Sequence, residues 1–283
     1  MPRPAVLAIL TAVALASCTQ APAGDAPLAR VSPAEPTIVS LNPCSDAVLA
    51  EVADPARLLA ISHYSHDPAS SSMDLAQARR FRAVSGSAEE VAALRPDVVV
   101  AGSFLAPATE AALARLGVRV VRVPIAASVV EARAQVRTLA RLAGNPARGE
   151  ALVGRIDAAL AAAAPPPGAP AVSAVVWQSG GIVPGSHTLI ADLLRRTGFV
   201  QLSAERGMRQ ADVLPLEAMI ADPPRVILAA GDSSAGEDRM LSHPALARLP
   251  GTRRERLDPA LLWCGGPTIV RAAARLAEVR GRL

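Results

Sequence analysis

The sequence predicts an α/β protein with two Rossmann-like lobes, each built on a central parallel sheet, joined by a single long rigid helix. Three observations lead to this prediction. The chain has 283 residues, of which 51% are hydrophobic, and this suits two packed lobes of about 100–150 residues each. Short β-branched runs alternate with amphipathic segments on both sides of residue 145, a pattern typical of parallel α/β units. One uninterrupted helical stretch separates the two blocks, so we expect the functional site in the cleft between the lobes.

The joining helix is predicted over residues 145–164. Asn145 and Pro146 suit its N-cap and first helical position, and apolar residues then recur at helical spacing. These apolar positions are Ala147, Ala151, Leu152, Ile156, Ala159 and Leu160. The sequence PPPGAP at 165–170 ends the helix because proline cannot continue it. The predicted boundaries are an N-terminal lobe at 37–144, the helix with its proline-rich exit at 145–168, and a C-terminal lobe at 169–283.

The first 36 residues predict export and membrane attachment. Arg3 precedes the apolar run 5–16, which has the length of a signal-peptide core and is too short to span a bilayer. Its end, Leu15-Ala16-Ser17-Cys18, resembles a bacterial lipobox, which implies removal of residues 1–17 and acylation of Cys18. Two or more acyl chains anchor a protein stably, so we expect a lipid-anchored periplasmic protein of a Gram-negative bacterium, with residues 18–36 as a flexible tether. An ordinary secretory signal with an incidental cysteine is the alternative.

Composition argues against nucleic acid as a partner. All 29 basic residues are arginine, the net charge is +4, and the arginines are interleaved with acidic residues, as is typical of solvated helix faces. The sequence also contains no G-x-S-x-G, no H-E-x-x-H and no phosphate-binding glycine loop, so an enzyme is not expected. A periplasmic hydrolase that uses Ser179 or Cys44 remains as a third hypothesis.

Individual elements follow from local patterns. Strands are predicted at 37–41, 58–62, 98–101, 119–123, 171–177 and 226–229, and helices at 107–116, 188–197, 216–221 and 243–249, with a last helix from Gly265-Gly266 to about Arg280. Two capping boxes, Ser87 with Glu90 and Ser128 with Glu131, predict two further helix starts.

The two predicted lobes share an internal repeat. Five residues each have a counterpart 128 positions later: Glu89, Ala93, Pro96, Val98 and Ala101 match Glu217, Ala221, Pro224, Val226 and Ala229. In both sets a short helix leads through a proline into a buried strand. The identical spacing indicates a pseudo-duplicated design; convergence of two ordinary α/β units is the alternative.

The six aromatic residues are not spread over the predicted core. Tyr64, Phe104 and Trp177 lie at or just beyond the ends of predicted strands, and Trp263 precedes the last helix. Ligands of open parallel sheets bind outside the carboxyl ends of the strands, and rigid rings there offer flat apolar surface. We therefore predict that these four residues line a binding cleft. The alternative places Trp177 and Trp263 at the edge of the core.

The mature chain from Thr37 onward resembles a substrate-binding protein of an ABC importer, of the helical-backbone class that includes cobalamin-, ferric-siderophore- and haem-binding proteins. The resemblance is carried by residues 38–43, 62–65, 87–102, 177–185, 188–198, 243–244 and 266–267. It implies limited hinge closure, no catalysis and no cofactor of its own. It further implies a metal chelate as cargo, a corrinoid such as cobalamin or a ferric siderophore, and a permease with its ATPase as partners of a monomer.

The resemblance also implies roles for particular residues. Tyr64 matches a cleft tyrosine of cobalamin binders, and Glu89 matches a surface glutamate that docks onto arginines of the permease. The second docking glutamate, expected before the last helix, is absent from this chain, and the internal repeat makes Glu217 its substitute. Either glutamate could instead stabilise its own helix N-terminus. The predicted ligand-binding residues are Asn42, Pro43, Cys44, Tyr64, Phe104, Trp177, Gly180, Gly181 and Trp263.

Cysteine and histidine leave alternatives open. Once Cys18 is acylated, Cys44 and Cys264 form an even pair in an oxidising compartment; they could form a disulfide between the lobes, remain free thiols, or contact a metal chelate. A bridge would restrict opening, which argues against it in a protein that must release cargo.

The second functional hypothesis is a directly bound metal ion held by His63, His66, His187 and Asp67. The alternative is that these histidines are hydrogen-bonding groups at the rim of the cleft.

Overall fold

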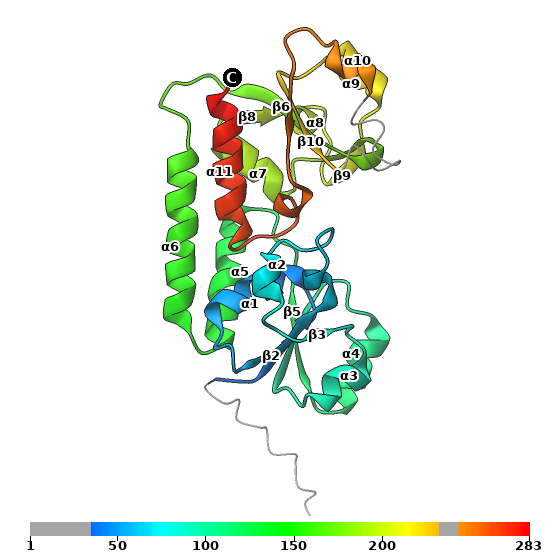
Figure 1. Cartoon of the computed structure of the whole chain (residues 1–283), viewed down its shortest axis with the longest axis vertical. Helices are drawn as coiled ribbons and strands as arrows, with labels where there is room; N and C mark the ends of the chain where they lie inside the picture. The colour runs from blue at the N-terminus through cyan, green and yellow to red at the C-terminus, as the bar shows by residue number, and fades with distance from the viewer. Residues whose placement is uncertain (1–34, 232–242) are drawn as a thin grey trace, which may run out of the picture. The chain divides into compact units, whose positions relative to one another are not determined.

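The computed structural model describes residues 35–231 and 243–283 (Figure 1). The predicted signal peptide, Cys18 and nearly all of the predicted tether lie outside the described residues. Among the helices of the described part, none combines the length and the apolar character that a bilayer span requires.

The first lobe contains a five-stranded sheet in the order β3-β2-β1-β4-β5, and every neighbouring pair is parallel. Its strands are β1 (Ile38–Ser40), β2 (Leu58–Ser62), β3 (Ala83–Val84), β4 (Val98–Gly102) and β5 (Arg119–Val123). Its helices are α1 (Pro43–Val52), α2 (Leu75–Ala78), α3 (Ala88–Ala93), α4 (Pro107–Arg115) and α5 (Val129–Leu142), with a 3₁₀ turn η1 (His63–His66) after β2. Residues of β1 and β4 are fully buried, as expected of central parallel strands covered on both faces.

The second lobe contains a four-stranded parallel sheet in the order β11-β10-β6-β8 and a separate antiparallel ribbon, β7 with β9. Its strands are β6 (Val172–Gln178), β7 (Ile182–Pro184), β8 (Phe199–Gln201), β9 (Ala211–Val213), β10 (Val226–Ala230) and β11 (Arg253–Arg256). Its helices are α7 (Leu189–Arg196), α8 (Leu202–Glu205), α9 (Leu216–Ala221), α10 (Pro244–Ala247) and α11 (Thr268–Gly281), with 3₁₀ turns η2 (Ser179–Gly181) and η4 (Pro259–Leu261).

The predicted joining helix is α6 (Pro146–Ala163), which contacts α1 and α5 of the first lobe and α11 of the second (Figure 1). Its buried face consists of Gly149, Leu152, Val153, Ile156, Leu160 and Ala163. Ala147 and Ala151, predicted to face the core, are exposed. Asn145 is the N-cap, but its side chain makes no capping bond. The apolar face of α6 belongs to one continuous cluster that also contains β1, β4, β6 and β10 residues, so a single core extends through both lobes.

The close approach of α5 and α6 requires a glycine. A Cβ atom added at Gly149 would lie 2.4 Å from the Cβ atom of Ala140 on α5, a distance that real side chains do not adopt. The two helices therefore pack with almost no space between their backbones at this point, which makes the connection between the lobes stiff.

The internal repeat corresponds to a structural repeat. Helix α3 and strand β4 begin and end 128 residues before α9 and β10. Both are interior strands next to an edge strand: β4 pairs with β1 and with the edge strand β5, and β10 pairs with β6 and with the edge strand β11. The two predicted capping serines are also confirmed: the side chains of Ser87 and Ser128 accept hydrogen bonds from the backbone N–H groups of Glu90 and Glu131.

Candidate functional site

A pocket of about 320 Å³ lies where the two lobes meet at the carboxyl ends of their strands. The first lobe contributes the loop between β5 and α5. The second lobe contributes the end of β6, the β7–β9 ribbon, the start of α7 and the segment after η4. The lining residues are Ile125, Ala126, Ala127, Gln178, Pro184, His187, Thr188, Leu189, Ile190, Gln210, Ala211, Leu262 and Trp263. This is the position at which open parallel sheets bind ligands.

The pocket lining is mostly apolar and includes the polar side chains of Gln178, His187, Thr188 and Gln210. Trp263 and Ile125, on opposite lobes, keep 54% and 65% of their surface exposed, although large apolar side chains are normally buried. Among the polar lining residues, His187 is exposed, and its Nδ1 lies 3.5 Å from Nη2 of Arg209. Such a surface can accept a flat apolar molecule that carries hydrogen-bond acceptors or negative charge on one side.

The wall formed by the second lobe is held by a small hydrogen-bond network. Thr188 caps α7 by accepting from the N–H of Ala191, and its hydroxyl donates to the carbonyl oxygen of Gly185 at 2.7 Å. The carbonyl oxygen of Pro184 accepts from the side chains of both Gln201 and Ser203, which are buried. These bonds fix the backbone that presents His187 to the pocket.

Of the nine predicted ligand-binding residues, Trp263 lines this pocket in the described part of the chain. The prediction for Trp177 is wrong: its side chain is 0% exposed and packs in an apolar cluster with Val175 and Val183. Strand β6 continues through Gln178, so Trp177 lies inside the strand, and residues Ala174 through Trp177 are all buried. The neighbouring Gln178 lines the pocket instead.

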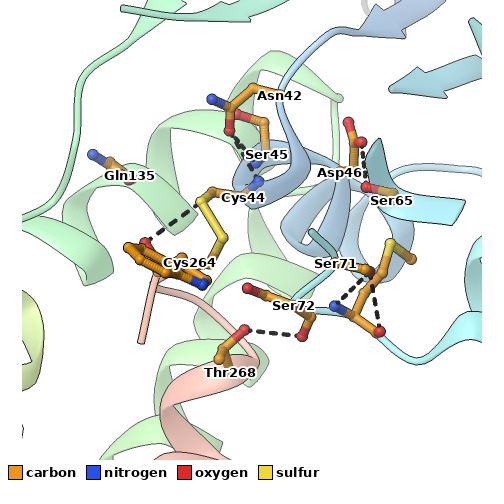
Figure 2. Close-up of a disulfide and its surroundings, with 12 residues drawn as sticks. Asn42, Cys44, Ser45, Asp46, Ser65, Ser71, Ser72, Gln135, Cys264 and Thr268 are labelled. Atoms are coloured by element: carbon orange, nitrogen blue, oxygen red, sulfur yellow. Dashed lines mark hydrogen bonds between the residues drawn. A yellow bond between two sulfur atoms is a disulfide. The ribbon is translucent and has the colours of Figure 1, made fainter. Parts of the chain in front are cut away.

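Asn42, Pro43 and Cys44 have structural roles that their sequence pattern did not separate from ligand binding. The side chain of Asn42 caps α1 by accepting from the N–H groups of Cys44 and Ser45, and Pro43 is the first residue of the helix (Figure 2). Cys44 forms a disulfide with Cys264 across 220 residues of chain (Figure 2). Of the three alternatives for this cysteine pair, the structure therefore shows the disulfide and not two free thiols or a chelate contact. The bridge joins the two lobes next to Trp263.

Tyr64 and Phe104 are exposed, at 52% and 87%, but neither lines the pocket as described. Tyr64 lies on η1, with its ring centroid 4.1 Å from that of His63. Gly180 has a φ of 69° with open space where a side chain would be, and Gly181 is buried. For these four residues, contact with a ligand stays a prediction.

A buried carboxylate supports the turn that carries Tyr64. Asp46, in the first turns of α1, accepts a hydrogen bond from the hydroxyl of Ser65 at 2.6 Å (Figure 2). It accepts a second from the N–H of Ser62 at 3.0 Å. Complete burial raises the pKa of Asp46 to about 7, although these hydrogen bonds act in the opposite direction. Sequence reasoning missed this residue, because an aspartate early in a helix is an ordinary feature.

The residues of the alternative metal site are not brought together in this structure. In residues 35–231 and 243–283, no three His, Cys, Asp or Glu side chains form a group that could hold a metal ion. His63 lies near the carbonyl oxygen of Val84 in the first lobe, whereas His187 lies beside Arg209 in the second.

The two predicted docking residues, Glu89 and Glu217, are both exposed in the first turns of α3 and α9.

Comparison with known proteins identifies the family. The family model described as periplasmic binding protein matches residues 38–257, most of the chain. The chain belongs to the periplasmic binding protein family. No curated protein matches the sequence.

Solved structures of other periplasmic binding proteins share this fold. The periplasmic haem-binding protein RhuT from Roseiflexus sp. RS-1, in apo form, is 23% identical over 86% of this chain and 97% of its own, with a TM-score of 0.71. A periplasmic haem-binding protein from Pseudomonas aeruginosa is 24% identical over 86% of this chain and 92% of its own, with a TM-score of 0.68. The vitamin B12-binding protein BtuF of Vibrio cholerae is 17% identical over 88% of this chain and 99% of its own, with a TM-score of 0.67. The predicted two-lobed α/β fold is confirmed.

Proposed function

We propose that this periplasmic binding protein is the cargo-binding component of an ABC importer and that its cargo is a metal chelate with a flat apolar face, a corrinoid or a ferric siderophore. Membership of the family supports the binding role. Structural relatives described as haem-binding and vitamin B12-binding support a chelate as the cargo class. The chelate is released unchanged, since the protein acts by binding.

The observation that carries this proposal is that Trp263 and Ile125, which come from different lobes, both line the pocket and both stay exposed. An indole ring and a branched aliphatic chain offer a flat apolar slot, and covering them removes apolar surface from water. His187 in the pocket lining and Arg209 beside it would receive the acidic or amide groups that such chelates carry. Within the described residues, no carboxylate lines this pocket, so an anionic cargo meets no charge repulsion from its walls.

Tryptophan fluorescence tests the proposal directly. The chain has two tryptophans, of which Trp177 is buried and Trp263 lies on the pocket. We expect cobalamin, a ferric siderophore or haem to quench the fluorescence saturably. The Trp263→Phe variant should lose most of the signal change while its circular dichroism spectrum stays the same. If no compound in this panel changes the fluorescence or binds by calorimetry, the proposed cargo class is refuted.

We further propose that Glu89 and Glu217 contact basic residues of the permease, one from each lobe. Both are exposed at the start of helices related by the internal repeat. Charge reversal, Glu89→Arg or Glu217→Arg, should abolish cargo-dependent stimulation of the reconstituted transporter's ATPase without changing cargo affinity. Glu205→Arg, an exposed glutamate on α8, is the matched control and should retain stimulation. Equal loss in all three variants would show a general charge effect and refute specific docking.

The lipid anchor at Cys18 is part of the same proposal. The sequence before it has the small residues that a lipobox requires, and two or three acyl chains would hold the protein at the membrane. The Cys18→Ser variant should move from the membrane fraction to the soluble periplasmic fraction. Mass spectrometry of the wild-type protein should show an N-terminal diacylated or triacylated Cys18; an unmodified N-terminus elsewhere would refute acylation.

A further inference from the structure

The segment after Trp263 is held by the first lobe, although it belongs to the second. Cys264 is bonded to Cys44 of α1. The next two residues approach the first lobe so closely that a Cβ atom at Gly265 would lie 2.8 Å from the Cβ of Ala132, and one at Gly266 would lie 2.6 Å from Cγ2 of Val48. The segment thus lies directly against α1 and α5.

Two polar contacts continue this attachment into α11. The hydroxyl of Thr268 donates to the carbonyl oxygen of Ser72 at 3.3 Å, and the guanidinium of Arg271 donates to the same oxygen. Figure 2 shows Ser72 of the first lobe beside Thr268, below the bridge. Both contacts are non-covalent and lie on α11, whereas the disulfide is covalent and adjoins the pocket residue Trp263.

We propose that the Cys44–Cys264 bridge positions Trp263 against the wall of the first lobe, so that the cargo pocket is preformed in the oxidised protein and loosened when the bridge is reduced. The inference rests on the proposed function for its cargo. The bond is one residue from the indole and is anchored at the capped start of α1, which Asn42 holds. Rigid presentation of a binding residue improves affinity by lowering the ordering cost at the moment of binding.

Reduction of the Cys44–Cys264 bridge proceeds by ordinary thiol–disulfide exchange. A dithiol reagent supplies two electrons and two protons; the S–S bond breaks, the protein gains two thiols, and the reagent becomes a disulfide. Cys44 is partly accessible, while Cys264 is 3% exposed, so the reagent approaches from the side of α1. A thiol count in denaturant should rise by two when reductant is added first, and an unchanged count would refute the bridge.

The position of Trp263 can be measured without any cargo. In the Trp177→Phe background, Trp263 is the remaining tryptophan, and its quenching by acrylamide reports its exposure. We expect stronger quenching after reduction and in the Cys44→Ser/Cys264→Ser variant than in the oxidised protein. If either variant fails to fold, the reduced wild-type protein gives the same test, with its Trp263→Phe counterpart subtracted.

Arg271→Gln is the matched control, because it removes another contact between the lobes and leaves the bridge intact. Its quenching should equal that of the oxidised parent. Equal quenching in the oxidised and reduced proteins would overturn the inference, and so would an increase in Arg271→Gln as large as that in the cysteine variant, since the effect would then be general loosening.

Affinity provides the second measurement. Titration with cobalamin, a ferric siderophore or haem should show binding to the reduced protein that is weaker by roughly tenfold. Failure of every compound to bind either form would refute the proposed cargo, while the quenching experiment would still decide the inference. Equal affinity of both forms for a compound that does bind would overturn it.

Discussion

Two aspartates at the same distance from the N-caps of their helices behave in opposite ways. Asp46 lies four residues after the N-cap Asn42 of α1, and Asp192 lies four residues after the N-cap Thr188 of α7. Asp46 is completely buried, and burial raises its pKa to about 7. Burial alone would also raise the pKa of Asp192, but hydrogen bonds from the N–H of Val129 and from two arginines outweigh it and lower the pKa.

The difference comes from what each carboxylate binds. Asp46 accepts from Ser62 and Ser65 within its own lobe, and among the described residues no cation pairs with it. Asp192 pairs with Arg195 and Arg196, and it accepts a hydrogen bond at 2.9 Å from the first residue of α5, in the other lobe. The same helical position thus supports a local turn in one lobe and the contact between lobes in the other.

The largest expected effect tests the buried aspartate. Because the folded protein holds a proton on Asp46 between its unfolded pKa of 3.8 and about 7, folding takes up a proton in this range. The free energy of unfolding should therefore fall as pH rises from 4 to 7, by roughly 4 kcal/mol from this group at about 1.36 kcal/mol per pKa unit.

The Asp46→Asn variant isolates this contribution. One oxygen of Asp46 accepts both hydrogen bonds, and asparagine keeps such an oxygen, so the variant mimics the protonated acid. Urea unfolding of both proteins at pH 5 and pH 8 should give similar stabilities at pH 5 and a more stable variant at pH 8. Parallel pH profiles would contradict the assignment of a raised pKa to Asp46.

Asp192→Asn should have a smaller effect of opposite pH dependence. Its carboxylate stabilises the fold when charged, so the contribution is present above pH 4 and is lost as pH falls through the lowered pKa. We expect the variant to be less stable by roughly 1–2 kcal/mol at pH 7, as for hydrogen bonds to a charged group. The difference should shrink in acid; a deficit that persists at pH 2 would show that charge is not its cause.

The smallest expected effect concerns the internal repeat. Ser87 caps α3 by accepting from the N–H of Glu90, whereas its counterpart 128 residues later, Pro215, makes no side-chain capping bond to α9. Ser87→Ala should lower the free energy of unfolding by about 1 kcal/mol, and Ser87→Gly by a few tenths. Equal losses for alanine and glycine would show that the hydroxyl does not act as the cap.

Sequence patterns predicted the elements whose signals are local. Helix α6 was found because prolines bound it on both sides, and β4 and β10 because their buried runs repeat at equal spacing. Strand β11 was not predicted because its sequence, Arg-Arg-Glu-Arg, has no apolar residue that would indicate a buried strand. It forms because its backbone pairs with β10, while Glu255 is surrounded by Arg253, Arg275 and Arg282. Such pairing depends on tertiary contacts that no local pattern contains.

The candidate site was predicted less well because it is assembled from distant segments. Ile125, Gln178 and Trp263 meet in one pocket, yet nothing in the sequence near Ile125 or Gln178 marks them as neighbours of an indole. The prediction for Trp177 is wrong because the predicted strand ends at residue 177, whereas β6 continues to Gln178. Trp177 therefore lies within the strand, in the core, and not at its end. The cysteine pair was recognised as a possible bridge, but its formation depends on the distance between lobes.

The bridge also constrains the order in which the molecule matures. A chain that emerges N-terminus first presents residue 44 long before residue 264, and 220 residues separate the two. The first sheet can therefore fold while Cys44 is still a free thiol. The disulfide can form only after almost the whole chain has emerged. We therefore expect the second sheet to pack against a first lobe that has already folded, and the disulfide to form after that packing.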